Sequence, residues 1–257
     1  MSTLSAFRTR LLWAHMALAS CFPHPSWSSE DAEFVQARFI LEKSDEIRFP
    51  SEGFQVDIDI SSTAPGQSSE NRKYRVLSKG NENTVVMILE PASERGQIML
   101  MKGRDLWVFM PNVSQPIRLG LAQRLTGEVS NGDLARANFS GDYTPKLLRR
   151  ESLYGEVFQV LELTAVARDV TYHRVLLWVN TTDYRPYKAE FYSLSSRLMK
   201  TCRYENFREM AGKRRPTRLV MEDALRHGEQ SVLEYGQMKL RNLPDKIFSK
   251  DYLKKLQ

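Results

Sequence analysis

The sequence predicts a mainly β protein, in which about eleven antiparallel strands form a curved sheet and a helix lies at each end of the chain. Beyond Pro50, apolar and polar residues alternate with a period of two, the pattern of a strand with one buried and one wet face. Such runs recur about every 8–14 residues, separated by Gly, Pro and Asn turns. Hydrophobic residues make up 42% of the 257 and charged residues 26%, so the chain has a core to bury.

The N-terminus has the three parts of an export signal. Arg8 and Arg10 precede a short apolar stretch at residues 11–18, and small residues follow it. The stretch is too short to span a bilayer, which needs about 20 apolar residues. We therefore expect residues 1–20 to form an export signal peptide and residues 21–257 to form one domain.

The end of this signal has two interpretations. Residues 18–21 read Leu-Ala-Ser-Cys, the form of a bacterial lipobox, and lipidation would make Cys21 the first residue of the mature protein. In the other interpretation the signal is cut at the small residues Ala17 and Ala19, and Cys21 is incidental. A lipidated protein is held on a membrane, because each buried methylene contributes roughly 0.8 kcal/mol, whereas the cleaved form diffuses.

The elements follow from the periodicity. Ser28 and Asp31 fit a capping box, and Phe34, Ala37 and Leu41 lie at helical spacing, so an amphipathic helix precedes the sheet. Residues 122–148 break the strand rhythm and predict a short helix or an irregular loop. The strands are expected at residues 54–60, 73–78, 84–90, 97–102, 106–110, 156–163, 172–179, 187–192, 198–204, 217–222 and 231–239. A helix at residues 244–256 closes the chain, with an apolar stripe of Ile247, Phe248, Tyr252 and Leu253.

A sheet of this size must curl over its apolar face or stack on a second sheet. Alternation selects one face of most strands, but residues 85–89, 98–101 and 106–110 are apolar on both faces. The ten methionines fit either a deformable ligand-binding surface or an ordinary core. The expected lining of the concave side is Val56, Ile58, Tyr74, Val76, Met87, Leu89, Met99, Met101, Trp107, Phe109, Ala189, Phe191, Leu219, Met221, Leu233 and Tyr235.

Composition excludes several classes of function. The formal charge is +6, or +4 after Arg8 and Arg10 leave with the signal, which is too mild to indicate nucleic acid. Four histidines and two cysteines show no metal-ligand spacing, so we expect neither a zinc site nor any other metal or cofactor. The sequence contains no Gly-x-Ser-x-Gly, Walker or HExxH motif, and we expect no enzyme.

The remaining chemically active side chains have structural explanations. His173 is expected to be a packed or rim residue rather than a general base, and Asp57 and Asp59 to lie on the wet face of their strand. Cys202 is expected to be buried with a free thiol, and a disulfide to Cys21 is the alternative. The basic group Lys213, Arg214, Arg215 and Arg218 fits a solvated loop, or contact with anionic lipid head groups.

Three segments, in order, resemble the LolA-like family of outer-membrane lipoprotein-sorting proteins. Residues 91–112, PASERGQIMLMKGRDLWVFMPN, resemble its central hairpin. Residues 186–192, PYKAEFY, followed by LMK at 198–200, resemble a later hairpin. NLPD at 242–245, with Phe248-Ser249 and Tyr252-Leu253, resembles the closing helix, so the similarity covers roughly residues 33–256. Residues 127–134 depart from the aromatic-rich, acidic loop of the family.

The resemblance implies an unclosed β-barrel with a helical lid over a hydrophobic cavity that accepts acyl chains. We therefore expect an exported carrier or acceptor of lipoprotein acyl chains or envelope lipids, in the periplasm of a double-membrane bacterium. The cavity should be left partly vacant, an inner-membrane transporter is an expected partner, and the lipobox fits a membrane-bound acceptor better than a soluble shuttle.

Two rival functions remain. In the first, the same fold serves as a periplasmic partner of a membrane exporter and handles another hydrophobic envelope molecule. In the second, the protein is a non-catalytic, lipid-anchored structural protein whose sheet is simply packed, without a cavity.

Overall fold

A computed structural model describes residues 29–136 and 138–253. The predicted signal peptide and the lipidation candidate Cys21 lie outside these residues. The elements are α1 (Ser29–Arg48), β1 (Phe54–Thr63), β2 (Glu70–Lys79), β3 (Asn83–Glu90), the 3-10 helix η1 (Ala92–Glu94), β4 (Ile98–Lys102), β5 (Asp105–Phe109), β6 (Ile117–Leu119), β7 (Arg124–Thr126), β8 (Val129–Ser130), α2 (Asn131–Ala135), β9 (Tyr143–Leu153), β10 (Glu156–Ala165), β11 (Arg174–Asn180), β12 (Pro186–Tyr192), β13 (Leu198–Met210), β14 (Lys213–Asp223), β15 (Gln230–Tyr235), β16 (Lys239–Leu240), η2 (Asp245–Phe248) and α3 (Lys250–Leu253).

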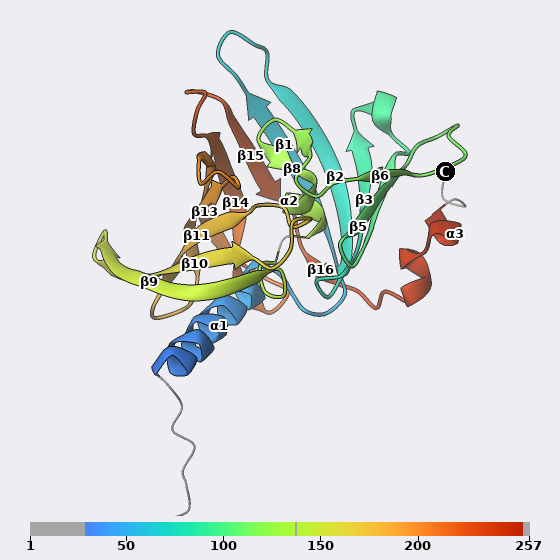
Figure 1. Cartoon of the computed structure of the whole chain (residues 1–257). Coiled ribbons are helices and arrows are strands. Elements are labelled where there is room, and N and C mark those ends of the chain that lie inside the picture. The colour runs from blue at the N-terminus through green and yellow to red at the C-terminus, as the bar shows by residue number, and fades with distance from the viewer. Residues whose placement is uncertain (1–28, 137, 254–257) are drawn as a thin grey trace, which may run out of the picture.

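One antiparallel sheet of 14 strands dominates the fold (Figure 1). Its order is β6-β5-β4-β3-β2-β1-β15-β14-β13-β12-β11-β10-β9, and β16 adds to β1. Most neighbours are consecutive hairpins, while β1 pairs with β15, so that Ile58 lies opposite Tyr235 and Ile60 opposite Leu233. The strands curve around a common interior and β6 and β9 form the two edges, which confirms the predicted unclosed, mainly β fold.

The largest element that the sequence analysis missed is β9, which was expected to be partly loop. Its residues are mostly exposed or half-buried, and Lys146, Arg149 and Arg150 interrupt any apolar alternation. The strand lies at an edge of the sheet and pairs with β10 alone. An edge strand that buries little apolar surface has no clear period in its sequence.

Helix α1 covers part of the interior with its C-terminal half only. Ala37 and Leu41 are buried against the sheet, as the helical spacing predicts, but Phe34 is 44% exposed. The first two turns of the helix are exposed, and α1 packs mainly on β9 and β14 (Figure 1). The predicted apolar stripe is therefore wrong at its N-terminal end. Among the described helices, none combines the length and apolar composition needed to cross a membrane.

The C-terminal segment packs on the outer, convex face of β3, β4 and β5. The expected helix at 244–256 is divided into η2 and α3, because Ser249 between them has an extended backbone. Phe248 and Leu253 are buried, and Ile247 and Tyr252 pack beside them, so the predicted apolar stripe is confirmed.

This outer layer explains why β3 and β5 were assigned the wrong orientation, which misplaced four of the expected lining residues. Met87, Trp107 and Phe109 pack under the C-terminal segment and not inside the trough, and Leu89 shares the parity of Met87 on β3. The residues that face the interior from these strands are Val86, Ile88, Leu106 and Val108. Since both faces are covered, both are apolar, and alternation could not separate them.

A pair of leucine substitutions tests this core. Leu177 on β11 is fully buried in the concave cluster, whereas Leu194 is 73% exposed. Leu177→Ala is expected to lower the free energy of unfolding by about 2–5 kcal/mol because it leaves a cavity, and Leu194→Ala by at most about 0.5 kcal/mol. Urea unfolding of both variants measures the difference, and equal midpoints would contradict the assigned core.

Candidate functional site

The concave side of the sheet forms an apolar trough. Twelve of the sixteen expected lining residues belong to its core, and Met87, Leu89, Trp107 and Phe109 do not. The twelve are Val56, Ile58, Tyr74, Val76, Met99, Met101, Ala189, Phe191, Leu219, Met221, Leu233 and Tyr235. That they contact lipid stays a prediction.

The trough is filled by the chain's own residues. Residues 121–142, which we call the insert, leave the sheet after β6 and return to it at β9, with β7, β8 and α2 between. Leu134, Ala135 and Phe139 of the insert belong to the same buried cluster as the trough lining, and α2 lies inside the curve of the sheet (Figure 1). The sequence analysis expected a short helix or an irregular loop at residues 122–148, and α2 is such a helix, while residues 143–148 belong to β9.

Among residues 29–136 and 138–253, two small cavities border the trough lining, each of about 20 Å³. One is bordered by Val56, Ile58 and Val76, and the other by Tyr204 and Tyr235. A cavity of that size holds about one water molecule, so a hydrocarbon tail does not fit beside the insert. The expectation of a partly vacant trough is therefore wrong for this conformation.

Two glycines allow the insert to approach the sheet closely. Gly127 has a φ of +48°, and a Cβ there would clash with the hydroxyls of Ser62 and Ser231. A Cβ at Gly132 would clash with the side chain of Thr171. The backbone amide of Glu128, the residue after Gly127, donates to Ser231 Oγ at 2.9 Å, so the backbone of the insert itself contacts the sheet.

A buried polar cluster, the Lys200 cluster, joins the insert to β13. Lys200 Nζ on β13 donates to Asp133 Oδ2 at 3.2 Å and to the carbonyl oxygen of Glu128. Tyr172 Oη donates to both Asp133 oxygens at 2.8 Å, and burial raises the pKa of Tyr172. The Lys200 and Asp133 side chains are only 6% and 8% exposed, so this is an ion pair inside the protein.

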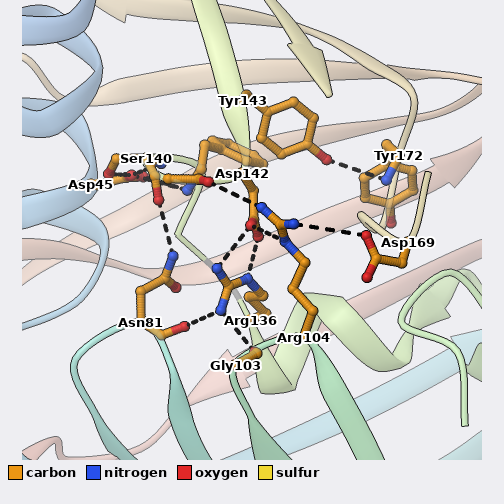
Figure 2. A network of polar contacts seen from close by, with 12 residues as sticks. Asp45, Asn81, Gly103, Arg104, Arg136, Ser140, Asp142, Tyr143, Asp169 and Tyr172 are labelled. Carbon is orange, nitrogen blue, oxygen red and sulfur yellow. Dashed lines mark hydrogen bonds and ion pairs between the residues drawn. The ribbon is translucent and has the colours of Figure 1, made fainter. Parts of the chain in front are cut away.

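A second cluster, the Arg136 cluster, anchors the other end of the insert (Figure 2). Arg136 pairs with Asp142 and also donates to the carbonyl oxygens of Asn81 at 2.6 Å and Gly103 at 2.9 Å. Asp45 of α1 accepts the amides of Phe139 at 2.9 Å and of Ser140 at 2.6 Å. The insert is thereby joined to the first helix and to two hairpins of the sheet.

Sequence reasoning missed both clusters. Lys200 and Asp45 lie in segments predicted only as strand and helix, and a buried charge has no periodic signal. One local sign was present, the spacing of Ser130 and Asp133, which form a capping box at the start of α2.

The basic group near β14 does not form one surface, so its interpretation as a single solvated or lipid-contacting loop is wrong. Arg215 is 2% exposed and donates to the α1 carbonyls of Glu46 at 2.7 Å and Ile47 at 3.1 Å, where it caps the helix. Burial lowers the pKa of Arg215. Lys213 pairs with Glu46, and Arg218 pairs with acidic residues of neighbouring strands.

Asp57, Asp59, His173 and Cys202 lie where the sequence analysis predicted. Asp57 accepts two hydrogen bonds from Arg75 at 2.7 and 2.8 Å, and Asp59 is exposed beside Lys73. His173 is exposed at the rim of the trough. Cys202 is a buried free thiol whose pKa is raised to about 12 by burial. These positions confirm the wet face, the rim histidine and the buried cysteine.

One group of carboxylates has the spacing of metal ligands. Oxygens of Glu128, Asp223 and Glu229 lie within 4.8 Å of one another. Arg226 lies among them and pairs with all three, at 3.3, 2.9 and 2.9 Å respectively. A guanidinium already balances this charge, so the geometry gives no argument for a cation.

Several solved structures share this fold. A DUF1329 family protein from Desulfovibrio piger is 20% identical with a TM-score of 0.75, and the match covers 86% of this chain and 99% of that one. A domain classed with the outer membrane lipoprotein-sorting proteins, from Vibrio parahaemolyticus, is 19% identical with a TM-score of 0.72, covering 86% and 99%. At these identities the matches establish the fold alone.

Sequence matches establish the family. No curated protein matches the chain, but a family model described as "Uncharacterized protein" matches residues 80–255. A LolA superfamily protein from Nitrosomonas europaea is 67% identical with a TM-score of 0.82, covering 84% of this chain and 98% of that one. With this identity over most of both chains, and with the same unclosed sheet, this protein belongs to the LolA superfamily.

Proposed function

We propose that this protein is an exported, non-catalytic carrier or acceptor that holds acyl chains of lipids or lipoproteins in the trough after the insert has moved out. The observation that carries the proposal is the way the trough is covered. Its lining is apolar along strands on both sides of the β1–β15 pair. Its cover, however, is a connection of 22 residues, from 121 to 142, and not a strand of the main sheet.

The free energy gained by burying an acyl chain can be compared with the cost of moving the insert out of the trough. Burying a chain of about 16 methylenes contributes up to about 13 kcal/mol, at roughly 0.8 kcal/mol each. Removing the insert exposes its five buried apolar residues, Leu121, Val129, Leu134, Ala135 and Phe139, and each large apolar side chain costs about 1.5–3 kcal/mol. Separating Lys200 from Asp133 adds little net cost, because both charges regain water, and Arg136 and Asp142 both belong to the insert and stay together when it moves.

The location is proposed on the sequence and the family. Residues 1–20 have the form of an export signal, and a LolA superfamily relative is 67% identical. The outer membrane lipoprotein-sorting domain with the same fold supports lipoprotein acyl chains as one cargo. We place the protein in the periplasm, with Cys21 as the point of lipid attachment to a membrane, and a membrane transporter as the source of cargo.

The two small cavities favour the rival function, a packed, non-catalytic interaction protein. Uptake of a fluorescent fatty-acid probe by the purified protein distinguishes the two functions. A carrier takes up the probe, and lipids extracted from the native protein contain acyl chains. Absence of both would contradict the carrier and support the packed sheet.

A disulfide that holds the insert in place tests the route to the trough. An ideal Cβ at Gly132 lies 3.0 Å from Thr171 Cβ. This distance is slightly shorter than the 3.5–4.5 Å between the Cβ atoms of a disulfide. In a Cys21→Ser background, Gly132→Cys with Thr171→Cys is expected to bind the probe when reduced and to lose at least about tenfold in affinity when oxidised. The control is Thr171→Cys alone under the same oxidant, and unchanged binding by the oxidised double variant would exclude movement of the insert.

Removal of the buried ammonium group tests what holds the insert closed. In a Cys21→Ser background, Lys200→Met leaves Asp133 buried without its cation, so the insert opens more often. Alkylation of Cys202, two residues away and buried beneath the insert, is expected to become at least about tenfold faster at pH 8. The exposed pair Lys73 and Asp59 gives the control Lys73→Met, which should leave the rate unchanged, and equal rates in both variants would contradict the role of Lys200.

A further inference from the structure

A separate pocket opens at the rim of the trough, outside the two small interior cavities. It has a volume of about 360 Å³ and lies between the insert, the loop from β10 to β11 and the hairpin from β12 to β13. We call it the rim pocket, defined by Arg124, Arg168, Arg197, Leu194 and Lys200. Its volume falls in the range of small-molecule sites, about 300–1,000 Å³.

Three arginines give the rim pocket an excess of positive charge. Arg124 comes from β7, Arg168 from the β10–β11 loop and Arg197 from the β12–β13 hairpin, and all three are exposed. Within residues 29–136 and 138–253, none of their guanidinium groups has a hydrogen bond or ion pair to a protein side chain. Most other arginines of the sheet are paired, as Arg75 is with Asp57 and Arg203 with Glu222.

The acidic residues of the rim pocket do not neutralise this charge. Glu128 and Asp223 both line it, and both are already paired with Arg226. Burial, followed by the charge of Asp223, raises the pKa of Glu128, and the charges of Arg124 and Arg226 oppose that shift. Three guanidinium groups from three separate segments therefore line the pocket without a direct ion pair, although Arg124 is close enough to Glu128 to interact with its charge.

Apolar groups surround these cations. Leu194 is 73% exposed, Leu225 53% and Met199 40%, and all three line the rim pocket. Lys200 and Tyr172 also line it and belong to the cluster that holds the insert over the trough. A molecule with a charged end and an apolar tail would contact the arginines at the rim and the trough behind the insert.

We propose that the rim pocket binds a phosphate group at the polar end of an acyl ligand. Guanidinium groups bind phosphate through paired hydrogen bonds, and a phosphate ester offers several oxygens to three of them. This inference rests on the proposed function, and it names the cargo class as phosphate-bearing lipid. The phosphate group can come from a lipid or from free phosphate ion, and the experiment separates the two sources.

Isothermal titration calorimetry with three probes tests the pocket. The probes are a short-chain phosphatidylglycerol, the matching diacylglycerol without phosphate, and inorganic phosphate. The wild-type protein is expected to bind phosphatidylglycerol at least about tenfold more tightly than diacylglycerol. Substitution of Arg124, Arg168 and Arg197 together by Ala is expected to remove that difference and leave diacylglycerol binding unchanged. Arg208→Ala is the matched control, an exposed arginine outside the pocket.

Each result decides the matter. Phosphatidylglycerol binding that falls to the diacylglycerol level in the triple variant, with weaker binding of inorganic phosphate by the wild type, supports the site and assigns it to lipid. Equally tight inorganic phosphate binding, lost in the same variant, supports an anion site for the free ion. Equal affinity for both lipids, or a triple variant that binds like wild type, overturns the pocket while the carrier stands. Failure to bind either lipid, with uptake of the fatty-acid probe also absent, contradicts the proposed function. If the protein then also fails to bind inorganic phosphate, both the proposed function and the rim-pocket site are wrong.

Discussion

The concave apolar face of the sheet has to be covered, and the contact between the insert and β13 through Lys200 and Asp133 helps to satisfy that constraint. An open sheet of this curvature leaves its inner residues exposed unless another segment fills the space. Here the filling segment is a connection between two edge strands, held by buried charges at one end and by Asp45 of α1 at the other. The position of α1, the closeness of Gly127 to the sheet and the small interior cavities are all consequences of that cover.

Under the proposed carrier function the cover has to move, and polar attachment suits that movement. An apolar interface gains free energy from every contact, whereas a buried ion pair contributes little net stability but strongly favours one geometry. The insert combines five buried apolar side chains with the Lys200 and Arg136 clusters, and these clusters fix its position over the trough. The rim pocket shares Lys200 and Tyr172 with one of these clusters, so a ligand bound as we propose would lie next to the contacts that keep the trough closed.

Periodicity predicted most of the fold because a strand with one wet face leaves a signal at every second residue. The strand from Phe54 and the later hairpins have that signal, and the apolar stripe of the C-terminal segment has the corresponding helical spacing. It failed at β9, an edge strand with little buried surface, and at β3 and β5, where the C-terminal segment makes the outer face as apolar as the inner one. The site was less predictable: twelve lining residues follow from alternation, but the residue pairs that close the trough join segments up to about 95 residues apart and have no local pattern.

Hydrogen–deuterium exchange of the lipid-bound and lipid-free protein tests the central claim most directly. If acyl chains replace the insert, amides of residues 121–142 lose protection when lipid binds, while those of β10 to β14 keep theirs. Insert amides that stay as protected with lipid bound as without it would contradict the account, because lipid would then be held somewhere other than the trough.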